Sequence, residues 1–179
     1  VIAHEGYGVN VERQEMPHPH CTVFSPDQKF VYVADLGNDR LYRYSFKSDE
    51  AKQPLKEPEP PYYEVPDGSG PRHFTFHPNK KFAYLINELS GNVIVYEYNS
   101  ETGDLKSIQT VPSVNAGGNE EKGSSEIFFR PDGKFLYTSN RGKFNDITIY
   151  KVASDGTLTE VGRQKVGLHP RYFMVDPTG

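Results

Sequence analysis

The chain has 179 residues, a length that suits one domain and is marginal for two, and 35% of its residues are hydrophobic. Its formal net charge of −4 comes without a basic stripe, so no nucleic acid partner is expected. No apolar run reaches the length of a membrane span, so no membrane partner is expected either. The single cysteine, Cys21, cannot form an internal disulfide, which favours a reducing compartment and predicts a cytoplasmic protein.

The chain is organised around a repeated unit of a short apolar strand, a turn that contains proline, and a second strand. Its 12 tyrosines and 11 phenylalanines favour such short strands over a helical bundle. Before the first unit, residues 1–17 lack a clear periodicity and predict a strand end followed by a long loop. The turn prolines recur about every fifty residues, a period typical of a propeller or another repeat array. They are Pro26, Pro78, Pro131 and Pro177.

Each complete unit is predicted to form four antiparallel strands joined by tight turns, which is the plan of a β-propeller blade. The first unit has predicted strands at residues 21–24, 30–34, 41–46 and 62–65, with a solvated connection at 47–61. The second has them at 74–76, 82–86, 93–98 and 105–111, and the third at 127–129, 135–139, 147–152 and 158–166. The predicted fold class is therefore all-β.

The repeats make residues 1–179 one partial β-propeller domain, with blades that start near residues 18, 71, 124 and 169. Three blades and the start of a fourth cannot close a ring, because propellers have about four to eight blades. We therefore expect this chain to be about half of a seven-bladed propeller. The remaining blades would come from the rest of a longer chain or from a second copy.

Alignment of the units on their turn prolines reveals two columns of residues whose chemistry differs from blade to blade. The first column lies six residues before each proline and contains His20, Arg72, Ser125 and Arg171. The second follows the second strand of each unit and contains Leu36, Glu88 and Arg141. Equivalent positions converge on one mouth of a propeller channel, so unlike charges there predict one ligand site. The candidate catalytic residues are His20, Arg72, Glu88 and Arg141.

Other polar features have simpler interpretations. Asp35, Asn87 and Asn140 directly precede the second column, and we expect them to cap a turn through hydrogen bonds to the backbone. The segment His18-Pro19-His20 lacks a third ligand, so no metal site is expected. Cys21 follows His20, and neighbours on a strand point to opposite faces, which places Cys21 in the core and not beside His20 as a nucleophile.

These residues resemble the lactonase family of seven-bladed propellers, which includes bacterial 6-phosphogluconolactonases and fungal 3-carboxy-cis,cis-muconate lactonizing enzymes. The resemblance covers essentially the whole chain and rests on VNVERQEMPHPHCTVFSPD, GPRHFTFHPNKKFAYLINELSGNVIVYEY and FRPDGKFLYTSNRG. It implies an active site in the channel mouth made of a histidine, a glutamate and two arginines, which match His20, Glu88, Arg72 and Arg141. The expected substrate-binding residues are Arg13 and Gln14 of the ERQ segment, together with His18, His73 and Arg171.

The resemblance implies the hydrolysis of an anionic, sugar-derived lactone without a cofactor. The main hypothesis is the conversion of 6-phosphogluconolactone to 6-phosphogluconate, a step in carbohydrate metabolism. His20 would move the proton, Glu88 would act as base or orient the water, and the arginines would hold the carbonyl oxygen or the anionic substituent. Two alternatives stay open: a lactonizing isomerase that acts on a carboxymuconate, and a non-catalytic propeller that binds a ligand or a protein partner.

Overall fold

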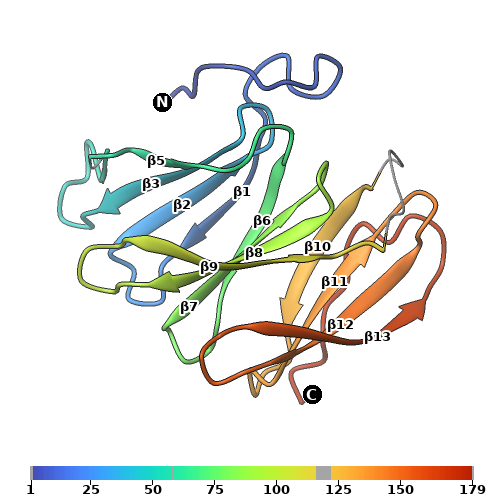
Figure 1. The fold of residues 1–179 in the computed structure, drawn as a ribbon. Coiled ribbons are helices and arrows are strands. Elements are labelled where there is room, and N and C mark those ends of the chain that lie inside the picture. The colour runs from blue at the N-terminus through green and yellow to red at the C-terminus, as the bar shows by residue number, and fades with distance from the viewer. Residues whose placement is uncertain (1, 58, 116–121, 179) are drawn as a thin grey trace.

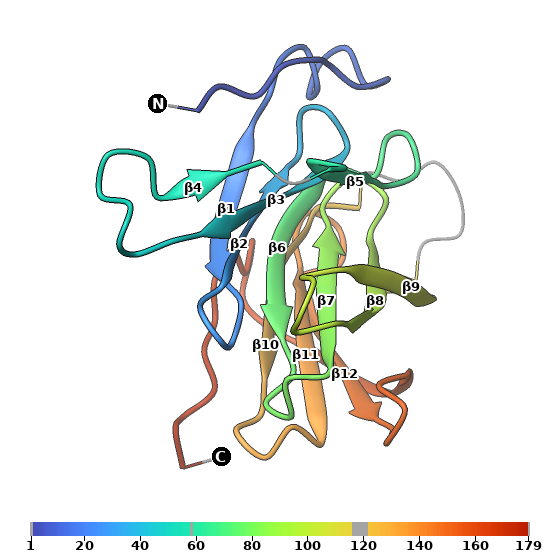
Figure 2. The same ribbon diagram turned by 90° about the vertical axis from the view of Figure 1, so that its left-hand side faces the viewer.

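The computed structural model describes residues 2–57, 59–115 and 122–178, and these ranges are all-β (Figure 1). Three antiparallel sheets fan out side by side, as two views at right angles show (Figures 1 and 2). Within the described ranges there is no helix, and hence none that is long and apolar enough to cross a membrane. The predicted fold class is confirmed.

The first sheet has five strands where four were predicted. They are β1 (Pro19–Phe24), β2 (Phe30–Asp35), β3 (Arg40–Phe46), β4 (Leu55–Lys56) and β5 (Tyr62–Glu64). The extra strand β4 pairs with the end of β3 inside the predicted solvated connection, because Leu55 packs against an apolar cluster on β2 and β3. Residues 2–18 contain no strand, so the strand end predicted there was wrong for this described part of the chain.

The second and third sheets have the predicted four strands in sequential order. The second contains β6 (Pro71–Phe76), β7 (Phe82–Asn87), β8 (Asn92–Tyr98) and β9 (Leu105–Pro112). The third contains β10 (Ser124–Phe129), β11 (Phe135–Asn140), β12 (Asp146–Val152) and β13 (Leu158–Lys165). In all three sheets the first strand begins two or three residues earlier than predicted.

The second strands of the first and second sheets are apolar because they are covered on both faces. Successive side chains of a strand point to opposite faces. In β2, Tyr32 and Ala34 pack into the core between the first and second sheets, whereas Val31 packs into a cluster on the opposite face. In β7, Leu85 faces the first sheet and Ile86 faces the third. The continuous apolar runs of the sequence are thus the blades' central strands.

The sheets are joined by a contact that recurs at each interface. The hydroxyl of Tyr32 in β2 donates to the carbonyl oxygen of Gly103 in the next sheet. Tyr84 of β7 donates in the same way to Gly156, at 2.7 Å. Both glycines have positive φ and stand against a phenylalanine ring of the preceding sheet, where a side chain would not fit. The repeat in sequence is therefore also a repeat of the interface.

The first strand of each sheet carries a β-bulge where the polar column lies. The pairing register shifts between Pro19 and Cys21, between Pro71 and His73, and between Ser124 and Ile127. His20 and Arg72 therefore lie within the first strands, so the prediction that they precede these strands was wrong. A bulge leaves a residue unpaired and turns its side chain out of the regular alternation. The bulges therefore allow the side chains of His20 and Arg72 to reach the candidate site from within a strand.

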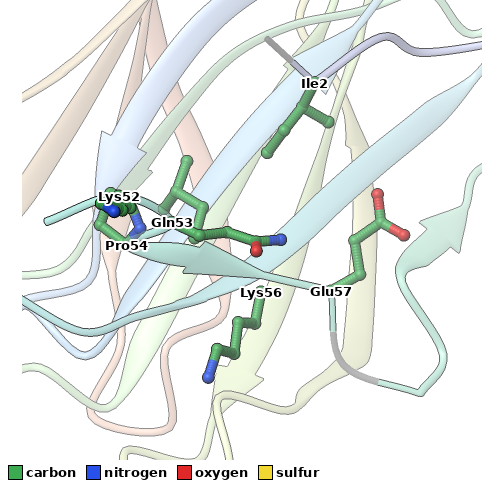
Figure 3. Close-up of a pocket in the computed structure, with 7 residues that line it drawn as sticks. Ile2, Lys52, Gln53, Pro54, Lys56 and Glu57 are labelled. Atoms are coloured by element: carbon green, nitrogen blue, oxygen red, sulfur yellow. The ribbon is translucent and has the colours of Figure 1, made fainter. Parts of the chain in front are cut away.

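The N-terminal segment runs over the end of the sheets where β1 and β6 begin (Figures 1 and 2). His4 stacks on Tyr42 with ring centroids 3.6 Å apart and contacts Asp35 through Nδ1 at 2.6 Å. A hollow of about 900 Å³ lies between this segment and β4 (Figure 3). Its lining from Ile2 and residues 52–57 holds no converging set of charges, so it is not the candidate site.

Candidate active site

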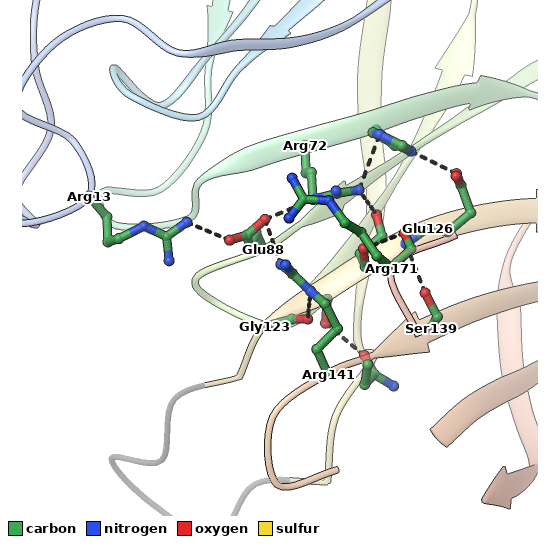
Figure 4. Close-up of polar contacts among 12 residues, drawn as sticks. Arg13, Arg72, Glu88, Gly123, Glu126, Ser139, Arg141 and Arg171 are labelled. Carbon is green, nitrogen blue, oxygen red and sulfur yellow. Dashed lines mark hydrogen bonds and ion pairs between the residues drawn. The ribbon is translucent and has the colours of Figure 1, made fainter. Parts of the chain in front are cut away.

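A buried carboxylate, Glu88, lies at the centre of the candidate site (Figure 4). Its Oε1 accepts a hydrogen bond from Nη2 of Arg13 at 2.5 Å. Its Oε2 lies 2.9 Å from Nε of Arg72 and 2.8 Å from Nη2 of Arg141. The glutamate side chain is 4% exposed. Three of the four candidate catalytic residues thus meet in one cluster, and Arg13 joins them.

Each member of this cluster comes from a different element. Arg13 is on a turn of the N-terminal segment, where the N–H of Gln14 donates to the carbonyl of Asn10. Arg72 is at the bulge of β6, and Glu88 follows β7 directly. Arg141 follows β11, and its Nε donates to the carbonyl oxygen of Gly123 at 3.0 Å. Only the fold brings these distant segments together.

The cluster keeps Glu88 ionised. Burial by itself raises the pKa of this carboxyl, but the hydrogen bond from Arg13 and the charges of Arg141 and Arg72 outweigh burial, and the net pKa is lowered. One carboxylate among three guanidinium groups leaves an excess of positive charge. A site of this kind attracts an anion.

Arg72 is held more tightly than the other arginines. It is 2% exposed, and burial lowers its pKa while Glu88 offsets that effect. Besides its Nε contact to Glu88, its Nη1 donates to the carbonyl oxygen of Ser125 at 2.7 Å and faces Nε2 of His73 at 3.1 Å. The hydrogen bonds of Arg72 to described residues use Nε and Nη1, and its Nη2 carries two further N–H donors.

His20, the fourth candidate, lies next to the arginine cluster. Its ring centroid is 5.7 Å from that of His73, in an edge-on arrangement. Burial, followed by the charge of Arg72, lowers the pKa of His20 to about 4. The imidazole is therefore neutral near pH 7 and has a free lone pair to accept a proton. A hollow of about 200 Å³ is lined by His20, Arg13, His18, Glu12, Glu15 and Leu36.

The remaining predicted substrate-binding residues differ in their placement. Arg171 is exposed, and its charge acts on Arg72; Figure 4 shows it beside the cluster. His18 is half-buried and lines the hollow. Gln14 is fully buried, and its amide donates to the carbonyl of Leu36 and accepts from the N–H of Asn10. Gln14 thus shapes the N-terminal turn, and its part in substrate binding stays a prediction.

Glu126 was missed by the sequence reasoning. It is 6% exposed, and its Oε1 lies 2.7 Å from Nδ1 of His73. Glu126 and His73 occupy the same repeat position, one residue after the first polar column, where the first sheet has Cys21. A third column at this position would have identified it. Cys21 itself is partly buried and packs against the core, and burial raises its thiol pKa to about 11, which keeps it protonated near neutral pH.

The column of Asp35, Asn87 and Asn140 is buried in all three sheets. Asp35 accepts hydrogen bonds from the backbone N–H groups of His18 and Gly37, as expected for a turn cap. Asn140 binds the carbonyl oxygen of Ser113 and the hydroxyl of Ser124. These contacts fix the strand ends that carry the site, including the one before Arg141.

The three sheets, with a buried carboxylate that gathers arginines at one end, are blades of a β-propeller with a candidate site for an anion. The chain belongs to the family described as "Lactonase, 7-bladed beta-propeller", whose profile matches residues 1–179. It is 38% identical over 178 residues to a 6-phosphogluconolactonase of Bacillus subtilis and 37% identical over 177 residues to one of Formosa agariphila. These alignments cover 98% and 97% of this chain and 49% of each relative.

A solved structure, the periplasmic gluconolactonase of Pseudomonas aeruginosa, is also similar. It superposes with a TM-score of 0.92 at 35% identity, covering 100% of this chain and 50% of that chain. The chain thus spans about half the length of the relatives it matches.

Proposed function

We propose that the protein hydrolyses a sugar-derived lactone, 6-phosphogluconolactone, to 6-phosphogluconate. The observation that carries this proposal is the excess of arginine around Glu88, next to a neutral histidine. Guanidinium groups bind phosphate and carboxylate oxygens through paired hydrogen bonds. The relatives described as 6-phosphogluconolactonases support the same substrate.

In the proposed reaction, His20 accepts a proton from water as the water oxygen bonds to the lactone carbonyl carbon. The carbonyl oxygen becomes an oxyanion, which the Nη2 donors of Arg72 stabilise. The ring C–O bond then breaks, and the proton on His20 passes to the departing alkoxide. The product is an open-chain hydroxy acid. No step requires a metal or a redox partner.

Glu88 has a different part from the base expected from the sequence. Both of its oxygens are engaged by arginines, so it does not take the proton in our scheme. It holds the guanidinium groups of Arg13, Arg72 and Arg141 at the site. Arg13, Arg141 and Arg171 are the proposed contacts for the phosphate and hydroxyl groups of the substrate, and His18 lines the entry.

The proposal is tested by incubating the complete protein with 6-phosphogluconolactone and measuring 6-phosphogluconate above the spontaneous rate. We expect turnover, and we expect His20→Ala to lower kcat by about 10²- to 10⁴-fold. We expect Glu88→Gln to lower the rate as well, because the arginines lose their anchor. Absence of turnover by a folded, complete protein would contradict the function, and an undiminished His20→Ala enzyme would contradict the role of His20.

We also propose that residues 1–179 are part of a propeller ring that further blades complete, supplied by the rest of a longer chain or by a second copy. Tyr137 of β11 occupies the position of Tyr32 and Tyr84, which bind glycine carbonyls of the following sheet. Tyr137 and Phe135 are only half-buried, and in a closed ring we expect them to contact a glycine turn of the next blade. Intact mass and size in solution test this proposal, and a fully active monomer of 20.3 kDa would contradict it.

The cytoplasmic location stays a prediction from the single cysteine. A relative of known structure is described as periplasmic, and a lone cysteine fits either compartment. Fractionation of the source cells distinguishes the two. Recovery of the protein with the periplasmic fraction would contradict the prediction.

A further inference from the structure

A chain of polar contacts runs from Glu126 to Glu88 through two neighbouring residues of β6 (Figure 4). Oε1 of Glu126 contacts Nδ1 of His73 at 2.7 Å. Nε2 of His73 contacts Nη1 of Arg72 at 3.1 Å, and Nε of Arg72 contacts Glu88. All four residues sit at one end of the second and third sheets. Of these residues, Arg72 and Glu88 belong to the proposed catalytic site, and His73 and Glu126 do not.

The donors and acceptors of this chain determine the proton positions. A guanidinium only donates, so Nε2 of His73 must be the acceptor and carries no proton. The remaining proton of a neutral imidazole is then on Nδ1, which donates to the carboxylate of Glu126. Glu126 also accepts the N–H of Ile127 at 3.0 Å, which suits an ionised carboxylate. His73 is therefore neutral, with its proton on Nδ1.

This arrangement directs the guanidinium of Arg72. Two of its nitrogens are occupied, Nε by Glu88 and Nη1 by Ser125 and His73 together. A planar guanidinium fixed at two nitrogens has its third fixed as well. In the proposed reaction, this fixed Nη2 is the donor to the oxyanion. A shift of the plane by as little as about 1 Å costs about 10²-fold in rate for groups that must be aligned.

Resting on the proposed function, we propose that His73 and Glu126 are positioning residues: Glu126 sets the tautomer of His73, and His73 orients Arg72 for the lactone carbonyl oxygen. This replaces the direct substrate contact expected for His73 from the sequence. Neither residue exchanges a proton with substrate.

Substitutions of His73 test the proposal in the complete protein. His73→Gln keeps a carbonyl oxygen for Arg72 and an N–H donor for Glu126, so we expect most of kcat to remain. His73→Phe keeps the ring but removes the acceptor, and we expect kcat to fall by about 10²-fold with a smaller change in KM. His77 provides a matched control, because it is also half-buried on the second sheet and its Nε2 contacts Gly133 of the third at 2.9 Å, away from the site. His77→Phe should change stability and leave kcat unchanged.

A second measurement is independent of turnover. With ¹⁵N-labelled histidine, the nitrogen shifts of His73, assigned by loss of signal in His73→Gln, report its tautomer. We expect a protonated Nδ1 and a bare Nε2, and loss of that preference in Glu126→Ala. A bare Nδ1, or a doubly protonated ring near pH 7, would overturn the proposal whatever the activity. If the tautomer is as expected but no lactone is hydrolysed, the function fails and the assignment of His73 and Glu126 as an orienting pair for Arg72 stands. Equal kcat in His73→Phe and His73→Gln would overturn the positioning role.

Discussion

The two ends of the sheets follow opposite rules. At the end with the proline turns, the repeats make the same backbone contact, with a phenylalanine as the acceptor each time. The N–H groups of Ser25, His77 and Arg130 donate to the carbonyl oxygens of Phe30, Phe82 and Phe135 at 2.8, 2.9 and 2.9 Å. At the site end, equivalent positions hold His20, Arg72 and Ser125. Sameness between repeats therefore marks architecture in this chain, and difference between repeats marks the site.

The physical reason lies in what each end must satisfy. At the turn end, each sheet has to close a short loop and pack on the next sheet. The same turn geometry meets both requirements in every sheet. The site end converges on one space, where identical charges would repel one another and could not surround one asymmetric ligand. Glu88 among Arg13, Arg72 and Arg141 is the result.

The largest expected effect comes from Arg72 at the site end. Arg72→Ala removes the oriented donor and leaves its partners unpaired, so we expect kcat/KM to fall by about 10³-fold and the free energy of unfolding by about 3 kcal/mol. Arg72→Lys keeps the charge and should lose less stability. Arg130→Ala at the turn end removes a partly exposed ion pair with Asp132 and a cation–π contact with Phe135, and should change stability by about 1 kcal/mol. Equal effects of Arg72→Ala and Arg130→Ala on kcat/KM would break the comparison.

The second effect belongs to the turn end. Gly156 has φ +83°, and a Cβ there would stand 2.5 Å from the ring of Phe82. Gly156→Ala should lower the free energy of unfolding by about 2–4 kcal/mol, through backbone strain and overpacking. Gly162→Ala is the control, because nothing lies within 4 Å of its Cβ position. Thermal unfolding measures both, while kcat of the folded fraction should be the same in the two variants.

The third effect concerns the pH dependence of the site end. His20 must be neutral to accept a proton, and its pKa is lowered from 6.5 to about 4. The activity should therefore persist from pH 7 down to pH 5 and fall only near pH 4. A histidine with an ordinary pKa would have lost about thirtyfold at pH 5. An acid limb of kcat/KM near 6.5 would contradict the proposed environment of His20.

The same shift affects stability in a defined direction. The unfolded chain binds a proton at His20 near pH 6.5, and the folded chain binds it only near pH 4. As the pH falls through this window, the unfolded state takes up more protons, so His20 lowers the stability. Denaturant unfolding at pH 7 and pH 5 measures this contribution as a loss of unfolding free energy at the lower pH. The part of the loss that comes from His20 should be absent from His20→Gln.

The smallest expected effect tests whether the proline turns share one backbone conformation. Lys80 follows Pro78 by two positions and has φ 64°, a conformation in which the equivalent residue of the third sheet is Gly133. Lys80→Gly should raise the free energy of unfolding by about 0.5–1 kcal/mol, since glycine adopts this conformation without a Cβ clash. Lys81→Gly, at an ordinary strand-entry position, should destabilise. Chemical denaturation of the two variants decides whether the turn geometry is as regular as the contacts indicate.

The sequence alone determined the class of fold and most of the site. Proline turns, apolar runs of four to six residues and a period of about fifty identify blades, because local turn chemistry and two-residue alternation need no distant partner. Comparison of equivalent positions then isolated Arg72, Glu88 and Arg141, which the structure brings together.

Only the tertiary structure decided how these residues meet. The bulges that place His20 and Arg72 within the strands have no local signal, because they depend on the register with a partner strand. The contact of Arg13 with Glu88 and the burial of Gln14 follow from where the N-terminal segment lies on the sheets. The link from Glu126 to His73 joins two sheets. Contacts between distant segments are set by packing in three dimensions, which a single sequence does not display residue by residue.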